Sequence, residues 1–313
     1  MSDIYLGRTL VIANPAAHSG RGETAALFVT RFFSTYHTAA DSCEVRHTEA
    51  PGDALAMARQ TAGYDTVVAL GGDGVVHEVA SGLMRIPEAF RPRLAIIPMG
   101  TGNDFARTLN MKRSDPEKAI AELLRGSERS IDLGKVNDAY FIQTLSFGLD
   151  ARIALDTSDR RANNARQQGA GLFVTSGIKL LPSGLNGWPY RVSIDGQNME
   201  GLGIVFAIQN GPTYGGGFKV CPSARPDDGM LDLCCSVSKP SLAHSIVLFE
   251  KIHGGRHTKS NKLFLSPFKH LEVEFTEEQP PCQIDGERFE ADRYVVDVVP
   301  NALRVIVPPG CPW

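Results

Sequence analysis

The sequence predicts a two-domain protein, an α/β domain with a parallel sheet followed by a mostly β domain that forms a sandwich or a barrel. Two observations support this prediction. Residues 1–130 alternate short apolar runs with helical patterns, whereas residues 131–301 carry mostly strand-like runs. The chain has 313 residues, and single domains usually hold about 100–200. The last residues, 302–313, contain one more apolar run and are candidates to rejoin the first domain.

Four apolar runs in the first domain predict strands, and helical patterns follow them. We expect strands at 9–15, 43–48, 65–72 and 93–98, and helices at 23–36, 52–62, 74–85, 103–109 and 116–125. Repeated βα units predict a Rossmann-like parallel sheet covered by helices. Ligands of such sheets bind at the carboxyl ends of the strands. Three loops follow strands directly and should meet at that edge: NPAAHSGRG (14–22), GGDG (71–74) and MGTGND (99–104).

The second domain is predicted from strand-like runs with two helical interruptions. We expect strands at 140–148, 190–196, 203–210, 229–238, 271–277, 281–290 and 294–299, and helices near 150–180 and 241–252. Several short strands with turn residues between them are typical of a sandwich or barrel.

Composition excludes several classes of protein. The net charge of −3 argues against general attraction to nucleic acid or to anionic membranes and leaves room for a local basic face. No apolar run reaches the roughly 20 residues of a membrane span. The six cysteines form no C-x-x-C pair or zinc spacing, which indicates reduced thiols in a cytosol. The N-terminus has no signal-peptide pattern. We therefore expect a cytoplasmic globular protein.

The GGDG stretch has two interpretations. Glycines allow backbone N–H groups to approach phosphate oxygens, and the start of the following helix favours negative charge. Asp73 could then hold Mg²⁺ or a water bound to it. Equally, the stretch could be a tight turn with Asp73 as a helix cap. It is neither a Walker loop nor a G-x-G-x-x-G fingerprint, because no GK[ST] follows and His77 occupies the last glycine position.

Two more loops carry polar groups suited to a nucleotide. In MGTGND these are Thr101, Asn103 and Asp104, of which Asn103 and Asp104 could instead cap the next helix. Asn14 ends a strand, and its loop could clasp a phosphate or ribose or be a plain connection.

Two acidic turns in the second domain are also ambiguous. Asp228, in PDDG, could bind a cation with nearby carbonyl oxygens, although a simple turn is favoured. In QIDGERFE, Asp-Gly between β runs is a strong hairpin signal, which would make Asp285 a turn residue. The functional alternative makes Asp285 a general base, with Glu287 supporting it or a metal.

Two stretches suggest surfaces rather than chemistry. GLFVTSGIKLLPSGL (171–185) is typical of a core helix, with the alternatives that it lines an acyl-chain cleft or rests on a membrane. The cluster His253, Arg256, His257 and Lys259 is typical of a solvated face.

Taken together and in order, GGDGVVHEV, IPMGTGNDFART, YGGGFKVCPSARPDDGMLDL and QIDGE resemble the bacterial soluble diacylglycerol kinase and lipid kinase family. That family includes sphingosine kinases and is more distantly related to NAD kinases. The resemblance covers Asn14 to about Glu290. It implies an N-terminal nucleotide-binding α/β domain, a C-terminal β domain, an active site in the cleft between them, and ATP-dependent phosphorylation of a lipid hydroxyl.

The resemblance also implies site residues. It places ATP at Thr48, at Thr101 and along the loop Gly71, Gly72, Asp73, Gly74, Val75, Val76 and His77. It implies that Asp285 is the base, with Glu287 beside it. It implies a structural Mg²⁺ site made by the Asp228 side chain and the carbonyls of Arg225 and Met230.

Two positions depart from the family pattern, which usually reads G-G-D-G-T, one residue, then Asn. Here Val75 and His77 stand at those places. A hydrogen bond lost from a charged group costs roughly 1.5–3 kcal/mol, so weaker ATP binding is expected. His77 can still donate one hydrogen bond.

The expected function is phosphorylation of diacylglycerol to phosphatidic acid with ATP and Mg²⁺. One alternative is an NAD-kinase-like enzyme, against which the PDDGMLDL and D-G-E segments argue. Another is a non-catalytic nucleotide- or lipid-binding regulator, which Val75 keeps open. We expect peripheral, reversible membrane contact through the β domain and no nucleic-acid partner; an exposed β edge could support a homodimer.

Overall fold

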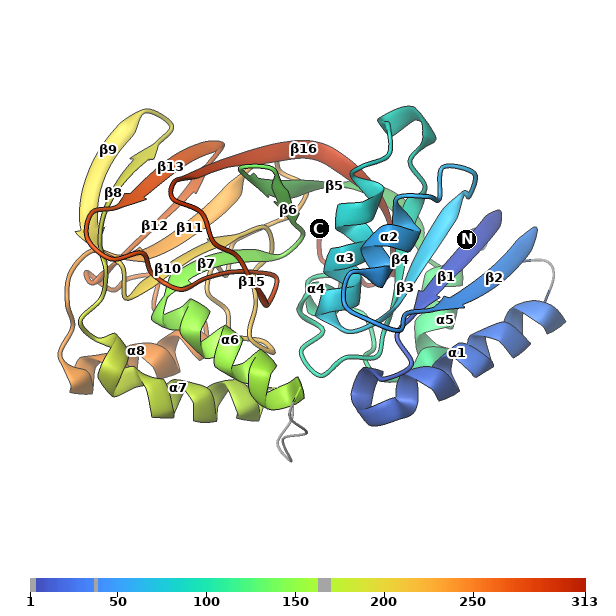
Figure 1. The fold of residues 1–313 in the computed structure, drawn as a ribbon, viewed down its shortest axis with the longest axis horizontal. Helices are drawn as coiled ribbons and strands as arrows, with labels where there is room; N and C mark the ends of the chain where they lie inside the picture. Colours follow the sequence, from blue (N-terminus) through green and yellow to red (C-terminus); the bar gives the residue numbers. More distant parts are fainter. Residues whose placement is uncertain (1–3, 37–38, 163–169) are drawn as a thin grey trace. The chain divides into compact units, whose positions relative to one another are not determined.

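The computed structural model describes residues 4–36, 39–162 and 170–313, which divide into two compact units (Figure 1). Unit 1 comprises Met1–Ile131 together with Asn301–Trp313, and unit 2 comprises Asp132–Pro300. The fold class is confirmed, because unit 1 is an α/β domain with a parallel sheet and unit 2 is built mostly from antiparallel strands.

Unit 1 contains the four predicted parallel strands in the order β2-β1-β3-β4. Their bounds are β1 (Arg8–Ala13), β2 (Ser42–His47), β3 (Thr66–Gly71) and β4 (Arg93–Pro98). Nearly every residue of β1, β3 and β4 is buried, as expected where helices cover both faces. The end of β16 (Tyr294–Val307) lies beside β4, where Val305 pairs with Leu94.

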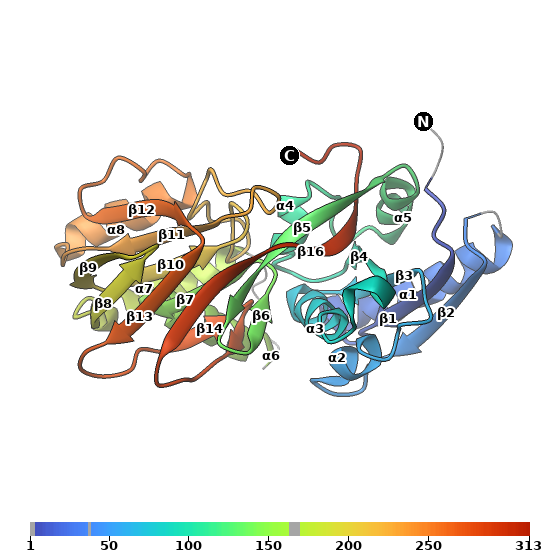
Figure 2. The same cartoon turned by 90° about the horizontal axis from the view of Figure 1, so that it is seen from above.

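The helices of unit 1 cover both faces of this sheet (Figure 2). They are α1 (Ala17–Thr35), α2 (Asp53–Ala58), α3 (Asp73–Leu83), the short 3₁₀ helix η1 (Glu88–Phe90), α4 (Asp104–Thr108) and α5 (Pro116–Leu124). The connection from β1 to β2 runs opposite to those from β2 to β3 and β3 to β4. Because such crossovers are right-handed, α1 lies on one face and α2 and α3 on the other.

Helix α1 begins earlier than predicted, at Ala17 instead of residue 23. The glycine-rich stretch expected to be loop forms its first turns. Gly22 lies so close to the Asn14 carbonyl oxygen that a Cβ would overlap it, which is why this part of the chain carries glycine. The start of α5 follows its sequence signals, since Asp115 accepts a hydrogen bond from the Lys118 N–H at 3.1 Å.

Unit 2 consists of two antiparallel sheets with a layer of helices. One sheet has the order β16-β13-β8-β9, and the other has the order β12-β11-β10-β7-β14-β15. The bounds are β7 (Thr144–Gly148), β8 (Pro189–Ile194), β9 (Gln197–Leu202), β10 (Val205–Gln209), β11 (Leu231–Ser236), β12 (Leu263–Phe268), β13 (His270–Phe275), β14 (Cys282–Ile284) and β15 (Glu287–Arg288). Strands β5 (Ser127–Val136) and β6 (Ala139–Phe141) form a hairpin, and β5 pairs with β16.

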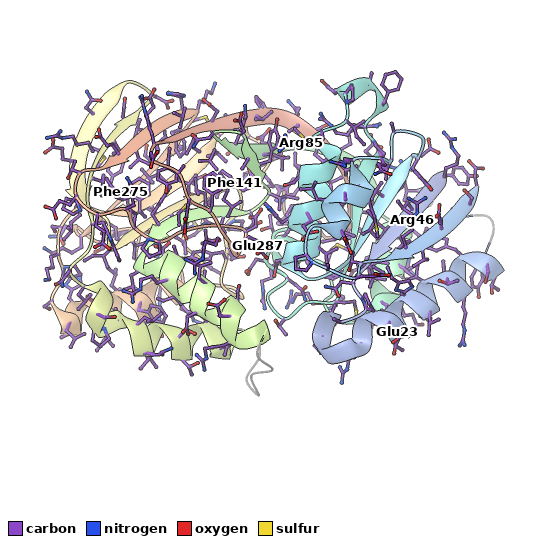
Figure 3. All side chains as sticks on the ribbon, viewed as in Figure 1. Glu23, Arg46, Arg85, Phe141, Phe275 and Glu287 are labelled. Carbon is purple, nitrogen blue, oxygen red and sulfur yellow. The ribbon has the colours of Figure 1, made fainter. Side chains whose placement is uncertain are left out.

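Aromatic side chains from both sheets form the core between them. Phe147 of β7 contacts Phe275 of β13 with ring centroids 5.3 Å apart, and Tyr190 of β8 meets Phe206 of β10 edge-on at 4.9 Å. Phe141 and Phe275, labelled in Figure 3, belong to this cluster. Each aromatic pair contributes about 0.5–1.5 kcal/mol beyond its buried area. These cross-sheet contacts make unit 2 a sandwich.

Three helices pack beside the sheet that contains β7, β10 and β11. They are α6 (Leu149–Ala162), α7 (Ala170–Gly184) and α8 (Leu242–His253). A second apolar cluster fills the space beneath them, with Phe173, Phe218 and Leu248 among its members. Within the described ranges, no helix is long and apolar enough to cross a bilayer.

Several predicted strand boundaries in unit 2 were wrong. The runs 294–299 and 302–309 belong to one strand, β16, although Pro300 and Asn301 interrupt the apolar pattern and Asn301 has positive φ. The run 140–148 is divided between β6 and β7. Strand β9 was missed because it is polar and largely exposed. The Asp195-Gly196 turn before it has positive φ at both residues, as such hairpins require.

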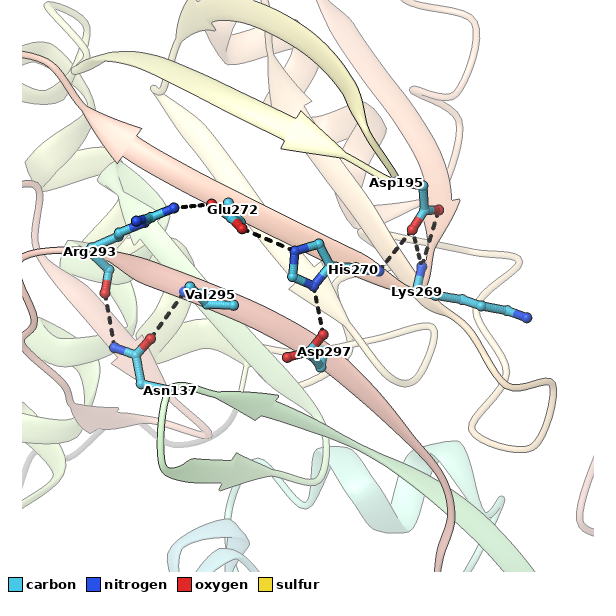
Figure 4. A network of polar contacts seen from close by, with 8 residues as sticks. All are labelled: Asn137, Asp195, Lys269, His270, Glu272, Arg293, Val295 and Asp297. Carbon is cyan, nitrogen blue, oxygen red and sulfur yellow. Dashed lines mark hydrogen bonds and ion pairs between the residues drawn. The ribbon is translucent and has the colours of Figure 1, made fainter.

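A polar network ties the turn after β8 to β13 and β16 (Figure 4). The Asp195 carboxylate accepts hydrogen bonds from the backbone N–H groups of Lys269 and His270. The His270 ring lies between Asp297, at 2.7 Å, and Glu272, at 3.3 Å. The hydrogen bond to Asp297 raises the pKa of His270. This contact therefore stabilises the folded state at low pH and is lost as pH rises through the raised pKa.

Candidate active site

The predicted polar loops of unit 1 lie at one edge of its sheet. The strands are parallel and in register, so the residues after their carboxyl ends are neighbours. The backbone N–H of Asn14 donates to the Leu70 carbonyl at 3.0 Å, and that of Thr48 donates to the Ala13 carbonyl at 2.9 Å. In the order β2-β1-β3-β4, strand β2 is added on one side of β1, and β3 and β4 are added on the other. The strand order therefore switches direction between β1 and β3. That is the point where open α/β sheets bind ligands.

Asp73 joins the two glycine loops. Its Oδ2 accepts the Asn103 N–H at 2.7 Å, and its Oδ1 accepts the Asp104 N–H at 2.6 Å. The sequence left Asp73 open as a metal ligand or as a cap of its own helix. In the structure it caps the start of α4, thirty residues further along the chain. Its two carboxylate oxygens therefore hold the two glycine loops together.

The glycines of these loops are required by close packing. A Cβ on Gly72 would lie 3.1 Å from Gly100 Cα, and a Cβ on Gly100 would overlap the Gly72 backbone more severely. A Cβ on Gly102 would lie 2.6 Å from Asp73 Oδ2. The two loops therefore touch through their main chains. This leaves the edge free of side chains where a phosphate would approach.

The 100–103 loop is closed by Asn103. Its side chain donates to the Gly100 carbonyl at 2.7 Å and accepts from the Gly100 N–H at 2.9 Å, with the backbone in the left-handed region at φ 50°. Asn103 is buried, and these contacts fix the shape of the loop. Thr101 differs, because its Oγ1 is buried and has no hydrogen-bond partner within the described residues. An orphaned hydroxyl in a phosphate-sized loop fits a nucleotide ligand.

Val75 and His77 occupy the first two turns of α3. Val75 is 8% exposed, and its side chain packs so closely over Gly71 that a Cβ there would lie 2.7 Å from Val75 Cγ2. Gly71 and Val75 therefore fit each other. His77 is half-buried. The backbone N–H groups at the start of α3 do not depend on these side chains, since helix N-termini leave such donors unused within the helix.

Glu78 is a structural residue that sequence reasoning did not identify. Its carboxylate accepts hydrogen bonds from the N–H groups of Gly52 at 2.9 Å and Ala54 at 3.0 Å. It therefore holds the start of α2, and with it the segment that follows Thr48. The contact joins residues 26 positions apart, and no local pattern announces it.

The D-G-E segment of unit 2 forms the predicted hairpin. Asp285 and Gly286 both have positive φ, at 48° and 96°, between β14 and β15. The Asp285 carboxylate accepts three backbone N–H groups, from Ile142 at 2.9 Å, Gln143 at 3.0 Å and Thr144 at 2.8 Å. Asp285 therefore fixes the chain that enters β7. The hairpin turn that the Asp-Gly pair predicts is therefore confirmed.

Glu287 lies two residues beyond Asp285 and differs from it. Its side chain is exposed and forms no hydrogen bond or ion pair within the described ranges (Figure 3). The hairpin thus presents one carboxylate anchored to the backbone and one carboxylate directed to solvent. The second can bind a cation or accept a proton without rearranging the fold.

The PDDG segment forms a tight acidic turn. Asp228 Oδ1 accepts the Met230 N–H at 3.1 Å, and the Arg225 guanidinium pairs with Asp227 at 3.0 Å. Burial is the largest cause that raises the pKa of Asp228, and the neighbouring carboxylate of Asp132 raises it further. Excess negative charge and carbonyl oxygens at one turn fit a hard divalent cation.

Asp132 is a second site-forming residue that the sequence did not single out. Its Oδ2 accepts the Gly229 N–H at 2.6 Å, and its N–H donates to the Pro226 carbonyl at 2.6 Å. Asn210 donates to the carbonyls of Asp132 and Ile142. A chain of hydrogen bonds therefore connects the acidic turn with the segment that Asp285 holds. The sequence signal that could have identified Asp132 was its position next to the predicted domain boundary at residue 131.

Asp150 is an acid in unit 2 with no predicted role. It is fully buried at the start of α6, where Oδ2 accepts the Tyr214 hydroxyl at 3.0 Å. Burial raises the pKa of Asp150 to about 7. It forms part of the wall of a mostly apolar cavity beneath α7 and α8.

The α/β unit with converging glycine loops and the β sandwich with an acidic hairpin define a diacylglycerol-kinase-like architecture. Residues 8–136 match the diacylglycerol kinase catalytic domain, and residues 143–307 match the YegS C-terminal NAD kinase beta sandwich-like domain. A solved diacylglycerol kinase structure from Bacillus anthracis superposes with a TM-score of 0.76 at 23% identity, covering 98% of this chain and 99% of its own. That likeness supports the fold.

Curated relatives identify the family. A "Probable lipid kinase YegS-like" of Pseudomonas aeruginosa is 34% identical over 270 residues, 86% of this chain and 85% of the relative. One from Yersinia enterocolitica is 31% identical over 270 residues, 85% and 88% of the two chains. The "Diacylglycerol kinase" of Bacillus subtilis is 30% identical over 282 residues, 90% and 89%. The chain belongs to this YegS-like and diacylglycerol kinase family of lipid kinases.

Proposed function

We propose that this lipid kinase transfers the γ-phosphate of ATP to the hydroxyl of diacylglycerol and releases phosphatidic acid and ADP. The observation that carries the proposal is the packing of the GGDG and MGTGND loops at one sheet edge, together with the buried Thr101 hydroxyl, which has no hydrogen-bond partner in the described part of the chain. The family name supports a lipid acceptor. Diacylglycerol is chosen because the Bacillus subtilis relative is named for it.

Unit 1 supplies the phosphoryl-donor site in this proposal. Main-chain N–H groups at the start of α3 face the phosphates, and Thr101 donates its hydroxyl. Asn14 and Thr48 flank them at the neighbouring strand ends. Such loops bind phosphate through backbone donors and the helix N-terminus, which compensates in part for the missing hydroxyl at Val75.

Unit 2 supplies the acidic groups. Phosphoryl transfer depends chiefly on positioning and charge neutralisation, because the transition state is loose. The lipid hydroxyl loses its proton to a carboxylate of the D-G-E hairpin. Its oxygen forms a bond to the γ-phosphorus, and the bond from that phosphorus to the oxygen it shares with the β-phosphate breaks. Asp285 is the proposed base, and its three N–H contacts fix its position.

Mg²⁺ fits two places among these residues. A structural ion would be held by the Asp228 carboxylate with the carbonyls of Arg225 and Met230. A nucleotide-associated ion would be held by Asp73 or by Glu287, whose side chain is exposed. Bound Mg²⁺ supplies positive charge that neutralises the phosphates during transfer.

The test is a phosphotransfer assay with radiolabelled ATP and a panel of acceptors. The panel contains dispersed diacylglycerol, phosphatidylglycerol, a sphingoid base and NAD, and labelled products are extracted and identified. Labelled phosphatidic acid supports the proposal. A labelled nucleotide product would favour an NAD-kinase-like reaction, and no turnover with any acceptor would favour a binding regulator. Either result would overturn the proposed reaction.

A further inference from the structure

Two helices of unit 2 expose large aliphatic side chains. In α8, Leu242, Ile246 and Val247 are 49%, 56% and 52% exposed, and Ile178 of α7 is 68% exposed. We call these four residues the α8 patch. The two helices are in contact, because a Cβ on Gly177 of α7 would lie 2.7 Å from Phe249 of α8.

The patch is not explained by the packing of α8. The helix buries Ser245, Leu248 and Ile252 at the spacing of one face. A surface helix ordinarily carries polar side chains on the opposite face. Here that face carries Ile246 and Val247. Single exposed aliphatic residues are common, but a group of them on adjoining helices marks an interaction surface.

The segment that contains α8 is basic. Residues 239–262 contain five lysines and arginines but one acidic residue, Glu250, in a chain whose net charge is −3. The five, which we call the basic segment, are Lys239, Lys251, Arg256, Lys259 and Lys262. Lys251 and Lys259 are exposed, and their side chains have no polar partner within the described residues. Exposed aliphatic residues together with basic ones are typical of helices that lie on anionic membranes.

The inner faces of the same two helices line an apolar cavity. Its volume is about 60 Å³, and its wall includes Phe173, Leu181, Leu248 and Ile252. Cavities lined by such side chains stay dry and accept apolar groups. Helices α7 and α8 therefore carry apolar side chains both toward this cavity and toward solvent. Such a layer suits a surface that contacts hydrocarbon.

We propose that the α8 patch docks unit 2 on an anionic lipid bilayer. The aliphatic side chains enter the interfacial region, and Lys251 and Lys259 contact phosphate groups. A second copy of the chain suits the surface less well, because a two-fold dimer would bring two copies of the basic segment together. The biological role of this docking rests on the proposed lipid substrate. Vesicle binding itself is measured without any catalytic activity.

The experiment is co-sedimentation of the full chain with phosphatidylcholine vesicles, with and without phosphatidylglycerol. We expect binding that requires phosphatidylglycerol and weakens with salt. The double variants Ile246→Glu/Val247→Glu and Lys251→Glu/Lys259→Glu should each bind about tenfold or more weakly. Leu27→Glu, at a 53% exposed leucine of α1 in unit 1, is the matched control and should bind as the wild type. Wild-type binding by both double variants would overturn the inference.

Two further measurements separate the explanations. Gel filtration of the same variants reports their oligomeric state. A dimer that the Glu variants dissociate would assign the patch to a second copy and overturn the membrane role. Activity on a short-chain diacylglycerol in solution should be unchanged in the variants, whereas activity on long-chain diacylglycerol in vesicles should fall. A wild type that binds vesicles but phosphorylates neither lipid would refute the proposed function and leave docking supported.

Discussion

Replacing Asp285 by Asn tests the role of the D-G-E hairpin. The carboxylate accepts three backbone N–H groups, two through Oδ1, from Gln143 and Thr144, and one through Oδ2, from Ile142. An asparagine that keeps its oxygen at the Oδ1 position loses the Ile142 bond and brings an NH₂ group against that donor. It also removes the charge from the other two bonds. Asparagine tolerates positive φ as well as aspartate does, so the turn itself is not strained.

The magnitude follows from these contacts. Hydrogen bonds to a charged group contribute about 1.5–3 kcal/mol each, and a buried donor left unpaired costs about 1–3 kcal/mol. We therefore expect Asp285→Asn to lower the free energy of unfolding by about 2–4 kcal/mol, a loss a protein of ordinary stability survives. Loss of a general base should also lower kcat by about 10²–10⁴-fold.

The assays are urea unfolding followed by circular dichroism and the phosphotransfer assay on the same preparations. Glu287→Gln is the matched control for stability, because Glu287 is exposed and its unfolding free energy should change by less than about 0.5 kcal/mol. A loss below about 0.5 kcal/mol in Asp285→Asn would refute the hydrogen-bonding argument. A folded Asp285→Asn variant with full kcat would instead refute its role as the base.

Three further changes test other parts of the molecule. Gly100→Ala should destabilise unit 1 by about 1–3 kcal/mol, because its Cβ overlaps the Gly72 backbone, whereas Gly63→Ala meets open space and should be neutral in thermal unfolding. Burial raises the pKa of Asp150 from 3.8 to about 7, so between these pH values the folded state holds a proton that the unfolded state has lost. The free energy of unfolding should therefore fall as pH rises from about 4 to 7. Asp150→Asn should flatten that slope when unfolding is measured across this range. Val75→Thr should lower KM for ATP about tenfold if the hydroxyl reaches a phosphate; an unchanged KM would refute that contact.

The elements of unit 1 were predictable because each carries a strong local signal. Three of the four strands, β1, β3 and β4, are short apolar runs ended by Asn, Gly or Pro, and burial on both faces keeps them apolar. Unit 2 was less predictable. Strand β9 has one exposed face and few apolar residues, and the split between β6 and β7 depends on the Asp285 carboxylate from 140 residues away. Such long-range contacts leave no periodic pattern.

The candidate site shows the same division. Sequence pattern located the glycine loops and the Asp-Gly hairpin, because turns at positive φ and helix starts require particular residue types. It did not reveal Glu78 or Asp132, whose carboxylates bond to backbone groups 24–26 and 97 residues away. A surface glutamate and one that anchors a distant helix look alike in sequence.

The sequence by itself determined that the chain has an α/β part and a β part, and that its glycine loops follow parallel strands. Those features depend on local periodicity and on backbone conformations that few residues adopt. Only the tertiary structure decided what the charged residues do. It showed that Asp73 caps α4, that Asp285 holds the entry to β7 and that Glu287 is directed to solvent. The reason is physical, because a carboxylate's role depends on which donors surround it, and the fold brings those donors from distant positions.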